Sequence, residues 1–200
     1  MCEDSEERNY LLAGYDRHFE RGKIRAYGLY GRVLDAGVGR GYSLLEILKL
    51  PNVEVVSVDL SDERIQQVEN LLMKNKVKHR VKFVRADLTA LPFMDEEFDC
   101  AVASNTLHHI PNWKKALEEL IRVSRNKVII QEFTNLGKKV MDSIITHEKR
   151  KIGHKHTHDG VDTEAVSRIL QKHGEVHIHR GVLTDILVLK LRNSPLSLNS

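Results

Sequence analysis

The sequence predicts an α/β fold, in which a doubly wound and mostly parallel sheet ends in an antiparallel hairpin. Apolar runs of strand length alternate with helix-like stretches over the first two thirds of the chain. The first run ends in a carboxylate and a glycine-rich loop, and two further apolar runs lie close together near the end. A chain of 200 residues is long enough to form one such domain with a full core.

Strands and helices are expected in strict alternation, as a parallel sheet with helical crossovers requires. The apolar runs predict strands near residues 33, 55, 83, 101 and 129 and helices at 43–50, 62–74 and 113–124. Ser61 is the expected N-cap of the second helix, because Ile65, Val68 and Leu72 follow it at helical spacing. Between Asp87 and Phe98 the chain has little periodicity, so this crossover is predicted to be a loop with at most a short turn.

The last third of the chain supplies the hairpin. Apolar runs at 176–181 and 186–191 are joined by a short polar turn, which predicts an antiparallel pair at the sheet edge. A helix begun by Asp162 or Thr163 precedes the pair.

We expect a single domain over residues 1–192. Residues 1–30 are expected to form an N-terminal helical cover, and 137–160 a lid or substrate segment. Residues 193–200 lack an apolar pattern and are expected to be disordered.

Composition narrows the class of protein. The net charge is +3, the longest apolar runs are far shorter than a membrane span, and the N-terminus reads MCEDSEERN, unlike a secretory signal. We therefore expect a soluble, cytoplasmic protein. Cys2 and Cys100 are the only cysteines, which argues against a disulfide framework or a cysteine metal site. No pattern in the sequence predicts an oligomeric state.

The stretch from Val33 to Gly41, reading VLDAGVGRG, carries the strongest functional signal. Glycine is needed where the backbone turns with positive φ or lies against a ligand, since a Cβ atom would collide there. Asp59 closes the next apolar run twenty residues after Gly39, the spacing of a carboxylate that binds ribose hydroxyls. Together these features predict a site for a nucleoside cofactor.

Two nucleoside cofactors compete for this pattern. A nicotinamide dinucleotide site requires G-x-G-x-x-G, but Tyr42 stands where the third glycine belongs. Asp35 lies two residues before the first glycine, where a carboxylate suits a cofactor with a positively charged amino-acid end better than a pyrophosphate. S-adenosylmethionine has such an end. Taken singly, Asp35 could also be a helix cap and Asp87 a turn residue.

The chain resembles the class I S-adenosylmethionine-dependent methyltransferases, in particular the small ubiquinone/menaquinone-methyltransferase-like group. The resemblance covers roughly residues 32–128. It rests on four ordered blocks, VLDAGVGRG, VVSVDLS, VKFVRADLTALPF and FDCAVASNTLHHIPN. It implies a Rossmann-like fold with a seven-stranded sheet, S-adenosylmethionine as the cofactor, and methyl transfer to a small or medium-sized acceptor.

The resemblance also implies roles for particular residues. Asp35, Gly37 and Gly39 would surround the methionine part of the cofactor, and Asp59 would bind the ribose with Leu60 beside the adenine. The adenine edge would contact Asp87 and Leu88. Ser104 and Asn105 would lie near the methionine end and the mouth of the substrate pocket. Because ligands of open α/β sheets bind beyond the carboxyl ends of the strands, we expect Asp35, Asp59, Asp87 and Asn105 to line one crevice.

A general base is needed only if the acceptor loses a proton. His109 is the candidate, with His108 second, and only one of the two neighbours is expected to face the crevice. A second histidine group, His154, His156 and His158, is interpreted as a solvated loop rather than a metal site, since metal ligands need supporting contacts.

Other functions remain open. The segment 138–155 is rich in lysine, which would favour an RNA or protein substrate, but the pI of about 8.8 is mild and no aromatic and basic residues alternate on a strand. A non-catalytic subunit that binds S-adenosylmethionine is a further alternative. A small-molecule acceptor is the leading prediction.

Overall fold

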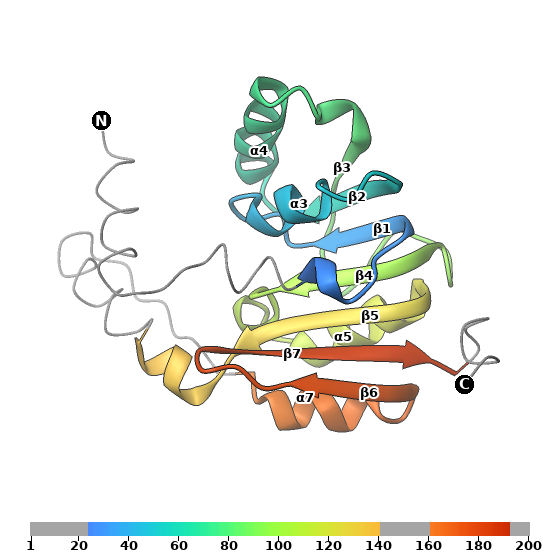
Figure 1. Ribbon diagram of the computed structural model, residues 1–200, viewed down its shortest axis with the longest axis vertical. Coiled ribbons are helices and arrows are strands. Elements are labelled where there is room, and N and C mark those ends of the chain that lie inside the picture. Colours follow the sequence, from blue (N-terminus) through green and yellow to red (C-terminus); the bar gives the residue numbers. More distant parts are fainter. Residues whose placement is uncertain (1–23, 141–160, 193–200) are drawn as a thin grey trace.

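The sheet has seven strands in the order β3-β2-β1-β4-β5-β7-β6, as seen in the computed structural model, which describes residues 24–140 and 161–192 (Figure 1). The strands are β1 (Gly31–Ala36), β2 (Val53–Asp59), β3 (Val81–Arg85), β4 (Phe98–Ser104), β5 (Ser124–Phe133), β6 (Gly174–His179) and β7 (Thr184–Leu191). The first five pair in parallel, and β7 runs antiparallel to both β5 and β6. The predicted fold class, sheet and hairpin are confirmed.

The helices that follow the strands begin close to the predicted positions. They are α3 (Tyr42–Ile47), α4 (Asp62–Lys74), α5 (Trp113–Arg122) and α7 (Thr163–Leu170). Ser61 caps α4 as expected, because its hydroxyl accepts a hydrogen bond from the Arg64 N–H at 3.2 Å. Asp162 caps α7 in the same way, through the Glu164 N–H.

Two helices end earlier than the sequence pattern predicted. Helix α3 stops at Ile47 rather than residue 50, because the Arg80 guanidinium donates to the carbonyl oxygens of Leu48 and Leu50 and holds the chain in a turn. Helix α5 stops at Arg122 because β5 begins at Ser124. Both differences arise from contacts with distant or following elements, which local periodicity does not report.

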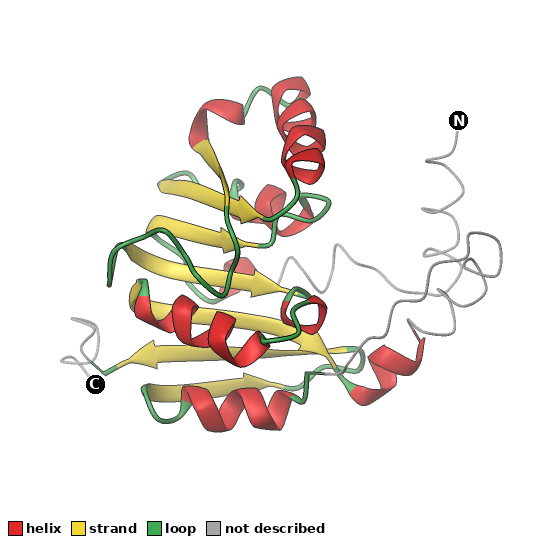
Figure 2. Cartoon of the chain, turned by 180° about the vertical axis from the view of Figure 1, so that it is seen from behind, coloured by secondary structure: helices red, strands yellow, loops and turns green. Residues whose placement is uncertain are grey.

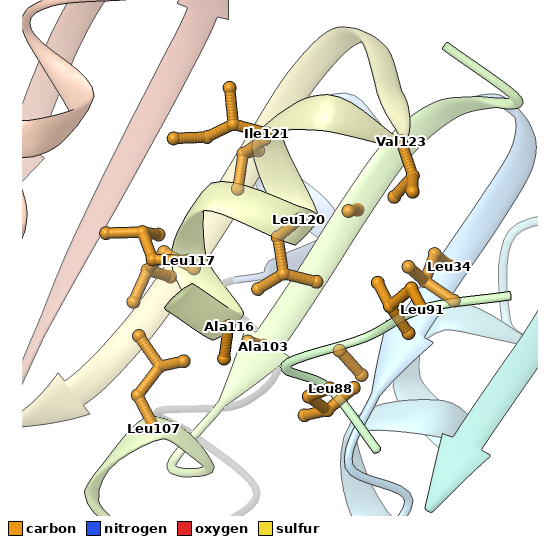
Figure 3. Packing of buried hydrophobic residues seen from close by; sticks show 14 of the residues in the cluster. Leu34, Leu88, Leu91, Ala103, Leu107, Ala116, Leu117, Leu120, Ile121 and Val123 are labelled. Carbon is orange, nitrogen blue, oxygen red and sulfur yellow. The ribbon is translucent and has the colours of Figure 1, made fainter. Parts of the chain in front are cut away.

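Both faces of the sheet are covered by other parts of the chain. Helices α5 and α7 cover one face (Figure 2), and α5 places Ala116, Leu117 and Leu120 against the sheet and the neighbouring loops (Figure 3). On the other face, α3, α4 and the segment around Ile24 pack against β1, β2 and β4. Continuous apolar strands, with polar residues at their ends, follow from this double coverage.

The crossover from β3 to β4 contains no helix in its described residues, as predicted. Arg122 holds this loop against α5: its guanidinium donates to the carbonyl oxygens of Leu91 and Phe93 and to the carboxylates of Asp95 and Glu119. These contacts raise the pKa of Arg122 and lower that of Glu119. The loop therefore has a defined path although it has little regular structure.

Several sequence expectations lie outside the described residues. They concern most of the N-terminal cover, most of the segment 137–160 with His154, His156 and His158, and the tail at 193–200. Among the described helices, none has the length and apolar character needed to cross a bilayer.

Candidate functional site

A cavity of about 690 Å³ lies beyond the carboxyl ends of β1, β2, β3 and β4. Its walls come from the loop that follows each of these strands, at residues 37–40, 59–61, 86–89, 104–106 and 109–112. Loops far apart in the sequence meet here because all parallel strands end at the same edge of the sheet. The volume is within the range of sites for small molecules and cofactors.

The glycine loop forms the floor of the cavity next to β1. Gly37 has φ 86°, and a Cβ at this position would lie 2.4 Å from Cγ2 of Thr106. The N–H groups of Gly37 and Val38 both donate to the Val58 carbonyl oxygen, which fixes the loop to β2. At Gly39, with φ 51°, the nearest atom to an added Cβ would be the Gly37 carbonyl oxygen at 4.0 Å, and the residue lines the cavity. The loop thus presents bare backbone to whatever the cavity binds.

The Asp59 carboxylate stands at the tip of β2 and faces the cavity. One oxygen accepts the Gly39 N–H at 3.1 Å, and the other accepts the Ser61 N–H at 2.9 Å. Each carboxylate oxygen keeps capacity for a further hydrogen bond. The backbone therefore fixes the Asp59 carboxylate in position. Its two oxygens can accept hydrogen bonds from a pair of vicinal hydroxyl groups.

Asp35 does not line the cavity, so the expectation that it faces the crevice is wrong. Its side chain is turned inward beneath the glycine loop, 1% exposed, and it is not among the residues that line the cavity. Its oxygens accept hydrogen bonds from the hydroxyls of Ser57, at 2.7 Å, and Ser43, at 3.3 Å. Burial raises the pKa of the Asp35 carboxyl to about 6, although the two hydroxyls lower it and the Asp59 charge adds to the rise.

The loops after β2 and β3 form the far end of the cavity. Leu60 and Leu88 supply apolar surface there, and Asp87 is exposed at its rim. The alternative interpretation of Asp87 as a turn residue is also correct, because the Thr89 N–H and hydroxyl both donate to Oδ1 at 2.8 Å. These two bonds lower the pKa of Asp87. The second oxygen, Oδ2, accepts neither of these bonds.

The loop after β4 contributes Ser104 and Asn105 to the opposite end of the cavity. Asn105 has φ 51°, a backbone conformation that residues other than Gly, Asn and Asp rarely adopt. Both polar atoms of its amide are enclosed and make no hydrogen bond within the described part of the chain. An enclosed amide without partners is unfavourable, so this side chain is poised to bond a ligand.

Glu132, at the end of β5, organises the same loop. Its side chain is 0% exposed, and one oxygen accepts the N–H groups of Thr106, at 3.1 Å, and Leu107, at 2.8 Å. The other oxygen contacts Nδ1 of His108 at 2.7 Å. His108 is therefore buried, whereas His109 is exposed and lines the cavity. This arrangement confirms that only one of the two histidines faces the crevice.

Sequence reasoning missed Glu132, Thr106 and Gln131. The available signal was the polar pair Gln131 and Glu132 within the apolar run VIIQEF. Polar side chains in a strand that is covered on both faces need buried partners, and here those partners lie in the loop after β4 and on β7.

Comparison with known proteins gives the family. Residues 33–127 match the profile of the family described as a methyltransferase domain. Over this stretch, slightly less than half of the chain, the protein is similar to the class I methyltransferases.

The curated relatives include the ubiquinone/menaquinone biosynthesis C-methyltransferase UbiE of two bacteria. The Pseudomonas putida (strain GB-1) protein is 29% identical over 137 residues, 66% of this chain and 54% of the relative. The Proteus mirabilis protein is 26% identical over 182 residues, 86% of this chain and 72% of the relative. This methyltransferase domain thus spans about half the length of the first of these relatives.

Solved structures agree on the fold. An S-adenosylmethionine-dependent methyltransferase from Aquifex aeolicus superposes with a TM-score of 0.62 at 19% identity, covering 91% of this chain and 93% of the other. A protein from Pyrococcus horikoshii superposes with a TM-score of 0.70 at 18% identity, covering 90% and 93%. The class I methyltransferase domain uses S-adenosylmethionine as its cofactor, and the competing nicotinamide interpretation receives no support from the family match.

Proposed function

We propose that the chain binds S-adenosylmethionine in the cavity and transfers the methyl group to a small or medium-sized acceptor, with release of S-adenosylhomocysteine. The observation that supports this most directly is the Asp59 carboxylate, which two backbone N–H groups, one of them from the glycine loop, hold at the edge of the 690 Å³ cavity. Such a fixed anionic acceptor fits the vicinal hydroxyls of a nucleoside.

The remaining contacts follow from the order of the strands. Asp59 would bind the ribose, and Leu60, Asp87 and Leu88 would contain the adenine. Gly37 and Gly39 would lie under the methionine part, with Ser104 and Asn105 at its end. The fit is supported by the bare Gly39 backbone in the cavity wall, where a side chain would occupy part of the cavity, and by the enclosed Asn105 amide without a hydrogen-bond partner. Asp35 would act on the bound cofactor through its charge from beneath the loop.

The bound cofactor supplies a sulfonium whose methyl group passes to a nucleophile while the electron pair of the broken bond stays on sulfur. The chain has to hold the acceptor in line with that bond and exclude water, and such positioning supplies much of the acceleration. Proton removal adds to this only for acceptors that lose a proton, such as a hydroxyl or an acidic carbon.

His109 is the proposed base for such an acceptor, because it lines the cavity while His108 is held by Glu132. The names of the relatives favour a small-molecule acceptor: UbiE is a C-methyltransferase, and a further relative is the 27-O-demethylrifamycin SV methyltransferase of Amycolatopsis mediterranei, 31% identical over 94 residues. If His109 is the base, His109→Gln lowers kcat with little change in cofactor affinity. A change confined to cofactor affinity would exclude the role.

The proposed function is tested by incubating the protein with methyl-labelled S-adenosylmethionine and a cell extract, then separating small molecules, lipids, RNA and protein. Label in the small-molecule or lipid fraction supports the proposal, provided that Asp59→Ala lowers the labelling at a cofactor concentration near the wild-type Kd. Label in RNA or protein instead favours the rival that uses the basic segment 138–155, most of which lies outside the described residues. Cofactor binding by calorimetry without any label indicates a non-catalytic subunit.

A further inference from the structure

Three polar side chains lie side by side across β4, β5 and β7, and we call them the polar row: Ser104, Gln131 and Thr184. The Ser104 hydroxyl donates to Oε1 of Gln131 at 2.8 Å, and Nε2 of Gln131 donates to Oγ1 of Thr184 at 3.2 Å. Gln131 is 0% exposed and Thr184 is 1% exposed. Only Ser104 lines the cavity. The row therefore connects the wall of the cavity to the core of the sheet.

The direction of these hydrogen bonds determines what Ser104 can offer to a ligand. A serine hydroxyl has one proton and two lone pairs. The proton is directed to Gln131, whose amide places its carbonyl oxygen toward Ser104 and its NH₂ group toward Thr184. With the observed orientation, Ser104 Oγ presents lone pairs only.

The place of Ser104 indicates which part of a ligand it meets. Asp59 stands on β2, and β4 lies on the other side of β1 in the sheet order. The loop after β4 packs directly against Gly37, since Thr106 occupies the space that a Cβ there would need. A nucleoside held at Asp59 therefore directs the rest of the cofactor across the glycine loop toward Ser104.

We propose that Gln131 is a positioning residue that fixes the Ser104 hydroxyl as an acceptor for the ammonium group at the amino-acid end of the cofactor. The inference rests on the proposed function. An ammonium group has three donors and no acceptor, so it matches a hydroxyl that presents lone pairs only, whereas a carboxylate is repelled by one. The polar row thereby selects the orientation of the amino-acid end, with the ammonium toward β4.

The experiment compares three ligands by calorimetry: S-adenosylmethionine, its analogue with hydrogen in place of the α-amino group, and 5′-methylthioadenosine, which reports on the nucleoside site alone. We expect the wild type to bind S-adenosylmethionine about tenfold more tightly than the analogue, because a charge-assisted hydrogen bond is lost in the latter. Gln131→Met, which keeps the size of the side chain, should reduce this preference to about twofold. Its affinity for 5′-methylthioadenosine should be unchanged.

Ser104→Ala should reduce the preference by the same factor, and the double variant should show no further loss, because the two side chains act through one hydrogen bond. If Gln131→Met does not fold, Ser104→Ala and Thr184→Val carry the test. A preference that persists in Ser104→Ala, or effects that add in the double variant, would overturn the inference. A wild type that binds both long ligands equally overturns this inference alone, and a wild type that binds none of the three ligands overturns the proposed function with it.

Discussion

Replacing Asp59 by alanine is the most direct test of the site, because two backbone N–H groups fix this carboxylate in the cavity wall. Its two oxygens already accept one backbone N–H each, from Gly39 and Ser61. The variant removes the acceptor for the ribose hydroxyls and releases two N–H groups at the partly exposed loop, where water can replace the lost bonds. The fold is therefore expected to survive, and thermal unfolding checks this.

The size of the effect follows from the hydrogen bonds that are lost. Hydrogen bonds to a charged group contribute about 1.5–3 kcal/mol. Losing the ribose contact should therefore weaken S-adenosylmethionine binding about ten- to a hundredfold, since about 1.4 kcal/mol corresponds to a factor of ten. The loss should exceed the effect of any change in net charge, because that effect is screened at physiological salt.

The assay is a calorimetric titration with S-adenosylmethionine and with its 2′-deoxy analogue. The wild type should bind the analogue more weakly, whereas Asp59→Ala should bind the two ligands almost equally. Asp62→Ala is the matched control, because Asp62 lies three residues away, pairs with Arg85 and does not line the cavity. Unchanged affinity in Asp59→Ala, or an equal loss in Asp62→Ala, would refute the assignment of the ribose site.

Three further predictions concern groups outside the cavity wall. Arg122→Ala should lower the free energy of unfolding by about 2–3 kcal/mol in urea titrations, because it removes the guanidinium that holds the β3–β4 crossover and pairs with Glu119; a loss below about 0.5 kcal/mol would contradict the role of the contacts. The Asp35 carboxyl releases its proton near pH 4 in the unfolded chain and near pH 6 in the folded one, so its ionisation destabilises the folded state. The free energy of unfolding of the wild type, relative to that of Asp35→Asn, should therefore fall by about 2–3 kcal/mol between pH 4 and 7. A difference that is independent of pH would exclude a raised pKa. Glu132→Gln should lower stability by about 1–3 kcal/mol, because the oxygen that contacts Nδ1 of His108 is replaced by an NH₂ group that cannot accept a hydrogen bond; a variant with the wild-type unfolding temperature would show that the carboxylate is dispensable.

Much of the fold was predictable from local patterns. Strand positions, the Ser61 cap and the glycine loop were predicted correctly because each depends on residues within one turn or one strand. The cavity was predictable in outline too, because polar residues at the ends of parallel strands converge whatever the details of packing. Asp59 and Asn105 therefore lie where the sequence placed them, around one cavity.

The sequence alone thus determined the order of the elements, the parallel sheet and the set of loops that meet at its edge, since periodicity and glycine placement encode these features locally. Only the tertiary structure decided that Asp35 turns inward to Ser57, that Glu132 holds the loop of His108, and that Gln131 directs the proton of Ser104. Each of these contacts joins residues more than twenty positions apart on different strands or loops. Their geometry depends on how the strands pair and how the buried polar groups find partners, which no local pattern specifies.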